Sequence, residues 1–273
     1  MKRRQLFAFI SIAVASLLLA IGLQVFDPSP VIAQSNTNLL VSAAASLKDA
    51  LGEINTLYQQ SKPGVNISYN FGASGALQQQ IEQGAPADVF ISAAKKQIDA
   101  LEQKGLLVPG TRTNLANNRL VLVVPSNSTG VTSFNTLTDP KVKKIAIGEP
   151  RSVPAGQYAE EVLQKLNIYD KIKTKLVLAN NVRQVLASVE SGNADAGLVY
   201  GSDAKISDKV KVAVVADDKS HSPIVYPMAV LKSSKNVDAA KDFVKFLSSD
   251  QTKGVLRKYG FIVKEAPVPT GSR

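Results

Sequence analysis

The chain has 273 residues and a formal net charge of +10, with 32 lysines and arginines against 22 aspartates and glutamates. It contains no cysteine, which excludes disulfides, thiolate metal sites and cysteine nucleophiles. Its single histidine, His221, excludes multi-histidine metal clusters. A basic chain can bind nucleic acid or another charged surface, but scattered lysines and the lack of tryptophan argue against that interpretation. A positive field also raises the encounter rate with small anions.

The first residues are typical of a secretory signal peptide. A basic start, Lys2 to Arg4, precedes an apolar run from Leu6 to Val25, and small residues that a signal peptidase recognises end at Ala33. We therefore predict that residues 1–33 are cleaved and that the mature protein is periplasmic. The alternative is an uncleaved membrane anchor, because about 20 apolar residues can span a bilayer. Without a cysteine, the mature chain cannot be tethered as a lipoprotein through an N-terminal thiol.

The remaining 240 residues (273 − 33) alternate short apolar runs with amphipathic stretches, which is the pattern of an α/β protein. Such alternation builds parallel sheets through right-handed crossovers, and about ten strands fit two smaller sheets better than one. In chain order we predict a strand over 38–43, a helix from 46, a strand over 65–71, a helix carrying residues 77 and 81, a strand over 88–92, a helix over 95–103, strands over 120–124 and 144–147, helices over 155–166 and 182–190, strands over 196–200, 210–215 and 225–231, and helices over 237–247 and 251–259.

Small or polar residues stand at five predicted junctions, each at the end of a strand, at the start of a helix or between the two. Small ligands bind beyond the carboxyl ends of such strands, where the following helices begin. The exposed N–H groups at a helix start also favour an anion. The five junctions are Ala43-Ala-Ala-Ser46, Gly72-Ala-Ser74-Gly, Val153-Pro-Ala-Gly156, Asn180-Asn-Val182 and Val199-Tyr200-Gly.

Two of these junctions carry a serine. Ser46 is predicted to cap a helix, with Asp49 at the position of a capping-box acid. The stretch around Ser74 is similar to the Gly-x-Ser-x-Gly turn of hydrolases, but Ala76 replaces the second glycine and no acid–histidine pair supports a nucleophile. A secreted hydrolase that uses Ser74 or Ser46 with a lysine base is the alternative from the enzyme class.

The junctions offer almost only hydrogen-bond donors, namely serine and tyrosine hydroxyls and backbone N–H groups. A fully deprotonated dianion, which only accepts hydrogen bonds, suits this set of groups. Hydrogen phosphate would need an acceptor in the pocket. Asp49 or Asp203 could supply one, so the residues alone leave the choice of anion open.

Several motifs in the same order resemble the periplasmic molybdate-binding proteins of ABC transporters, and the similarity runs from about Leu39 to Val263. The resemblance implies an α/β type II periplasmic-binding fold of two lobes, each a mixed sheet flanked by helices. It places lobe one at residues 35–117 plus 222–273 and lobe two at 118–221. The motifs are Ala43-Ala-Ala-Ser46-Leu, Gly84-Ala-Pro-Ala-Asp88-Val-Phe-Ile-Ser92, Val153-Pro-Ala-Gly156, Val199-Tyr-Gly-Ser-Asp203 and Arg257-Lys-Tyr-Gly-Phe261.

The same resemblance implies which residues bind the ligand. Ser46 and Ser74 would contact it from lobe one, and Tyr200 from lobe two through its hydroxyl. Ala155 and Val182 would contact it through their backbone N–H groups. Two positions depart from some relatives: only one hydroxyl stands in Gly72-Ala-Ser74-Gly-Ala, and Asn181 replaces an acid. Neither departure removes a proposed donor.

The function that the resemblance implies is capture of molybdate or tungstate and its delivery to an inner-membrane ABC permease. The metal would be bound as the oxyanion, without direct protein ligands to the metal. We expect no cofactor, no catalytic activity, no nucleic-acid partner and a monomer. Sulfate or another oxyanion is the alternative ligand.

Overall fold

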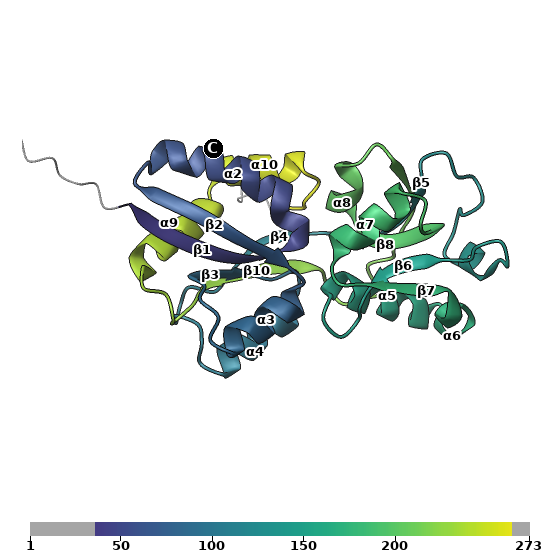
Figure 1. Ribbon diagram of the computed structural model, residues 1–273, viewed down its shortest axis with the longest axis horizontal. Helices are drawn as coiled ribbons and strands as arrows, with labels where there is room; N and C mark the ends of the chain where they lie inside the picture. The colour runs from purple at the N-terminus through teal and green to yellow at the C-terminus, as the bar shows by residue number, and fades with distance from the viewer. Residues whose placement is uncertain (1–35, 264–273) are drawn as a thin grey trace, which may run out of the picture. The chain divides into compact units, whose positions relative to one another are not determined.

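The computed structural model describes residues 36–263 and contains two separate five-stranded sheets (Figure 1). The predicted signal peptide, residues 1–33, lies outside the described residues. Within the described range, no helix is long and apolar enough to cross a membrane. We call each sheet with its covering helices a lobe.

The first sheet has the strand order β2-β1-β3-β10-β4. Strand β1 pairs in parallel with β2 and β3, whereas β10 is antiparallel to both β3 and β4. The strands are β1 (Thr37–Ala44), β2 (Val65–Gly72), β3 (Val89–Ile91), β4 (Thr113–Asn117) and β10 (Val225–Val230).

Helices cover both faces of the first sheet (Figure 1). On one face lie α2 (Lys48–Ser61), α9 (Val237–Leu247) and α10 (Asp250–Lys258), and on the other lie α3 (Ser74–Glu82) and α4 (Lys95–Gln103). Helix α9 shows why this packing forms, because its buried residues recur at the spacing of one helical face. These residues are Ala240, Phe243, Val244 and Leu247.

The second sheet has the order β7-β6-β8-β5-β9. Strand β6 pairs in parallel with β7 and β8, and β5 is antiparallel to β8 and β9. The strands are β5 (Leu120–Pro125), β6 (Ile145–Gly148), β7 (Leu176–Ala179), β8 (Ala196–Tyr200) and β9 (Val210–Val215).

The second sheet also has helices on both faces. Figure 1 shows α7 (Val182–Glu190) and α8 (Gly201–Lys205) on one side, and α5 (Pro154–Lys165) with the short α6 (Tyr169–Ile172) on the other. Within residues 36–263, 3-10 turns lie at Ala45–Leu47, Asn135–Thr138 and Lys173–Lys175. The two helix-flanked sheets confirm the predicted two-lobed α/β class.

Each sheet is mixed, as predicted, because one strand in each sheet is antiparallel to its neighbours. The chain passes from β4 directly to β5, and from β9 directly to β10, without an intervening helix. Consecutive strands of one sheet that are joined through a helix are parallel. This rule does not apply to β5 and β10, because the preceding strand of each belongs to the other sheet. Both strands are antiparallel to their neighbours. The residue boundaries predicted for the lobes stay a prediction.

Candidate oxyanion site

The five residues predicted as ligand contacts line one small cavity, although they come from five separate segments. Ser46, Ser74, Ala155, Val182 and Tyr200 share it with a set of small or apolar neighbours and one asparagine. These neighbours are Ala44, Ala45, Gly72, Ala73, Ala93, Val153, Pro154 and Asn181. All five predicted residues are at most 4% exposed, so the groups that line the cavity are buried.

The cavity is small. Its volume is about 10 Å³, which is on the scale of one water molecule. A sugar or a peptide does not fit such a space.

In the first lobe, the Ser74 hydroxyl is oriented by the backbone. Its Oγ accepts a hydrogen bond from the Ala93 N–H at 2.9 Å, and both residues line the cavity. Because that bond uses a lone pair of the oxygen, the hydroxyl hydrogen remains free to donate. Ser74 is the first residue of α3, as predicted.

Ser46 is not the helix cap that its sequence context predicts. Ser46 lies inside the 3-10 turn that precedes α2. The N-cap position of α2 is occupied by Leu47, so no side chain caps this helix. The Ser46 Oγ instead lies 2.9 Å from the hydroxyl of Tyr226 on β10. Tyr226 is 180 residues away in the chain, so no local pattern could have shown this competing partner.

Two helix starts in the second lobe supply the predicted backbone donors. Helix α7 begins at Val182, and the Asn181 Oδ1 caps it by accepting the Gln184 N–H at 3.1 Å, which confirms the predicted polar cap. Helix α5 begins with Pro154, one residue before the predicted start, and Ala155 follows. The N–H groups of Ala155 and Val182 make no hydrogen bond to any described residue. Such first-turn donors carry the positive end of the helix dipole.

A glycine pair brings the start of α5 close to the end of β6. A Cβ built on Gly156 would lie 2.0 Å from the carbonyl oxygen of Gly148. No side chain fits there, and the close approach holds the first turn of α5, with Ala155, against the cavity.

Tyr200 contributes a buried hydroxyl with no partner. Its side chain is 1% exposed, lines the cavity, and its Oη makes no hydrogen bond within the described part of the chain. Burial raises the pKa of this phenol well above its usual value, so the group keeps its proton. An unpaired buried hydroxyl costs free energy unless a ligand accepts its hydrogen.

The two lobes contact each other directly beside the cavity. The Gly75 N–H at the start of α3 donates to the Ser152 carbonyl of the second lobe at 3.0 Å. The Tyr158 hydroxyl of α5 lies 3.4 Å from the Ala93 carbonyl. The two lobes are therefore in direct contact next to the residues that line the cavity.

Arg183 bridges the lobes and was not predicted as part of the site. From α7 it donates to the Ser46 carbonyl at 3.1 Å and pairs with the Asp49 carboxylate at 2.7 Å, both in the first lobe. Its Nε also lies 2.7 Å from the fully buried carboxylate of Asp203 in its own lobe. In the sequence Arg183 is only the residue after Val182, and its partners Asp49 and Asp203 are recognisable only in the fold.

Burial raises the pKa of the Asp203 carboxyl to about 6 from its ordinary 3.8, although the adjacent Arg183 opposes the shift. The folded state therefore binds this proton more tightly than the unfolded chain does. The stability that Asp203 contributes is thus fully present below about pH 4 and is lost as the pH rises through about 6.

We expect the Asp203→Asn variant to lack this pH dependence. The free energy of unfolding of both proteins, measured in urea at pH 4, 5, 6 and 7, checks it. The value for the variant minus that for the parent should increase between pH 4 and 6 and level off above about 7. A difference that is the same at every pH, or that decreases with pH, would show that the pKa of Asp203 is not raised.

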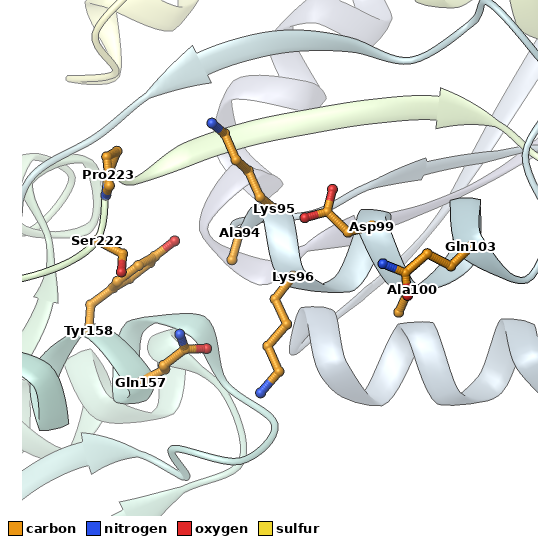
Figure 2. Close-up of a pocket in the computed structure, with 10 residues that line it drawn as sticks. All are labelled: Ala94, Lys95, Lys96, Asp99, Ala100, Gln103, Gln157, Tyr158, Ser222 and Pro223. Atoms are coloured by element: carbon orange, nitrogen blue, oxygen red, sulfur yellow. The ribbon is translucent and has the colours of Figure 1, made fainter.

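A second, wider space of about 510 Å³ lies between α4 and α5 (Figure 2). Lys95 and Lys96 line it, but both are exposed and Figure 2 shows their amines pointing in different directions. Its size and its diverging charges do not suit a small anion. No cluster of three or more histidine, aspartate or glutamate side chains able to hold a metal ion occurs over residues 36–263.

Comparison with known proteins agrees with this architecture. The family model for bacterial extracellular solute-binding proteins matches residues 39–262. The chain is 47% identical to a putative ABC transporter substrate-binding lipoprotein, YvgL, from Bacillus subtilis, over 84% of this chain and 87% of the relative. It is 41% identical to the molybdate-binding protein ModA of Haemophilus influenzae, over 84% and 92% of the two chains.

A solved structure shows the same fold. The substrate-binding domain of a putative molybdenum ABC transporter from Clostridium difficile is 52% identical, with a TM-score of 0.66, covering 84% of this chain and all of that one. The family model spans most of the chain, and close relatives align over more than four fifths of it. The chain therefore belongs to the bacterial extracellular solute-binding protein family, in the branch that contains the molybdate-binding proteins of ABC transporters.

Proposed function

We propose that this protein binds molybdate or tungstate between its two lobes and delivers it to an ABC permease. The observation that carries the proposal is the convergence of five hydrogen-bond donors from both lobes on one small cavity. The names of the Haemophilus influenzae and Clostridium difficile relatives point to the same ligand class. The oxyanion would be held through its oxygens, with no direct protein ligand to the metal.

The positions of the acidic groups favour a fully deprotonated dianion. Asp49 and Asp203 both pair with Arg183, and neither lines the cavity. The two acids that could have accepted a hydrogen from phosphate are therefore engaged elsewhere. Hydrogen phosphate would have to place its own O–H against donors, which is unfavourable because a buried donor without an acceptor costs about 1–3 kcal/mol.

The proposal includes binding without turnover, by an exported, periplasmic monomer. A serine nucleophile needs a base within hydrogen-bond reach. Here Ser46 lies next to the Tyr226 hydroxyl and Ser74 accepts a backbone N–H, so neither serine contacts a lysine. The arrangement suits hydroxyls that donate to a bound anion.

Calorimetric titration of the purified protein with molybdate, tungstate, sulfate and phosphate tests the proposal. We expect molybdate and tungstate to bind tightly at a 1:1 ratio and to raise the unfolding temperature by mass action. Phosphate should bind far more weakly. Tight sulfate binding with weak molybdate binding would assign the alternative ligand, and no binding of any of the four anions would refute the proposal.

A further inference from the structure

The Ser46 hydroxyl stands at the end of a chain of buried polar groups that leads away from the cavity. Its Oγ lies 2.9 Å from the Tyr226 Oη. The Tyr226 Oη in turn accepts a hydrogen bond from the Asn118 Nδ2 at 3.3 Å. Tyr226 and Asn118 do not line the cavity, and Tyr226 is fully buried. Their hydrogen bonds therefore reach the cavity through Ser46, although the Tyr226 ring also packs edge-on against the Tyr200 ring at 5.9 Å between centroids.

Asn118 sets the direction of this chain of hydrogen bonds. Its Oδ1 accepts the Arg119 N–H at 2.9 Å, so its side-chain nitrogen is the end that faces Tyr226. The same nitrogen donates to the Ser202 Oγ at 2.8 Å. An amide nitrogen only donates, so the Tyr226 oxygen accepts from it.

The single hydrogen of the Tyr226 hydroxyl must then go to another acceptor. Ser46 Oγ is the remaining polar atom that the structure places against the Tyr226 Oη, and an unpaired buried hydroxyl would be costly. Burial also raises the pKa of Tyr226, so the phenol keeps this proton. Tyr226 therefore donates to Ser46, whose own hydrogen is left to point elsewhere.

We propose that Tyr226 and Asn118 are positioning residues, which occupy the acceptor side of Ser46 and so commit its hydroxyl to donating into the cavity. The proposal rests on the proposed oxyanion function and extends it to residues outside the cavity. The Ser74 hydroxyl is also left to donate its hydrogen, because its oxygen already accepts the Ala93 N–H. Both serines then present hydrogens to the ligand, which favours dianions over ligands that carry a proton.

A double-mutant cycle between Tyr226 and Ser46 tests the proposal, with molybdate as the probe in calorimetry. Tyr226→Phe should weaken molybdate binding about tenfold, the effect of one hydrogen bond, because the Ser46 hydroxyl is no longer held as a donor. In a Ser46→Ala background the same change should have less than about a twofold effect. A purely structural role for Tyr226 would weaken binding equally in both backgrounds.

Selectivity gives a second measurement. Without the Tyr226 hydroxyl, Ser46 can rotate and accept a hydrogen, so the ratio of phosphate to molybdate affinity should rise in Tyr226→Phe. Tyr58→Phe is the matched control, because Tyr58 is also a buried first-lobe tyrosine but does not line the cavity or contact Ser46. It should change neither affinity nor selectivity. If Tyr226→Phe does not fold, Asn118→Ala should show the same non-additivity with Ser46→Ala.

The outcomes separate this proposal from the proposed function. Binding by the parent protein with additive effects of Tyr226→Phe and Ser46→Ala would overturn the positioning role alone. The absence of oxyanion binding by the parent protein would overturn both. A loss of affinity that appears only when Ser46 is present, together with the change in selectivity, would support the positioning role.

Discussion

Replacing Gly75 with alanine is expected to weaken oxyanion binding by about 10- to 100-fold without reducing the stability of the ligand-free protein. Gly75 lies in the first turn of α3, and a Cβ at this position would lie 2.6 Å from the carbonyl oxygen and 2.9 Å from the Cα of Ser152. Both of these atoms belong to the backbone of the other lobe, so a side-chain rotation cannot relieve the clash. The lobes would have to separate slightly, so closing them around a ligand would cost about 1–3 kcal/mol of binding free energy.

Separation of the lobes leaves the core of each lobe in place, and alanine is a better helix residue than glycine. The unfolding temperature of the ligand-free variant should therefore equal or exceed that of the parent. Gly52→Ala on α2 is the matched control, since nothing lies within 4 Å of a Cβ at Gly52. Calorimetry should show parent affinity for Gly52→Ala and reduced affinity for Gly75→Ala. Equal affinity of the two variants would contradict closure of the lobes at this contact.

Replacing Tyr200 with phenylalanine is expected to weaken molybdate binding by about 1–3 kcal/mol, which is about 5- to 150-fold. The phenol hydroxyl makes no hydrogen bond in the described part of the chain, so it is free to donate its hydrogen to a ligand. Removing a hydrogen bond within the protein would cost stability, but this hydroxyl has none to lose. We therefore expect the ligand-free variant to be as stable as the parent, or more stable.

Tyr69→Phe is a suitable control for the Tyr200 variant. The Tyr69 hydroxyl is also buried without a partner, but it lies on β2 outside the cavity. Thermal unfolding of the ligand-free proteins should respond similarly to both substitutions, whereas only Tyr200→Phe should lose affinity in calorimetry. A clear loss of ligand-free stability in Tyr200→Phe alone, with unchanged affinity, would make Tyr200 a packing residue.

Much of the site could be predicted because its parts have local sequence patterns. Small residues after a buried strand, and a polar cap before an amphipathic run, indicate a strand-to-helix junction whatever the rest of the chain does. The start of α7 after Asn181 and the proline at the start of α5 both followed this logic. Five predicted elements, α4, α7, α9, β8 and β9, match the structure at both ends.

The features that were missed depend on contacts between distant residues. Strand β4, Thr113–Asn117, is short and polar, and it pairs with β10, more than 100 residues later. The Ser46 hydroxyl bonds Tyr226 and not its own helix, because a buried phenol competes with the local cap. Arg183 forms ion pairs with Asp49 and Asp203, and these three residues become neighbours only in the folded protein. No periodicity in one segment can encode such pairings.

The most direct test of the account is a crystal structure of the protein grown with tungstate, with the tungsten located by anomalous diffraction. We predict one strong site per chain, inside the cavity, with oxyanion oxygens within hydrogen-bond distance of the Ser46, Ser74 and Tyr200 hydroxyls and of the Ala155 and Val182 N–H groups. Tungsten bound elsewhere, or in the cavity without contacts from both lobes, would contradict the account.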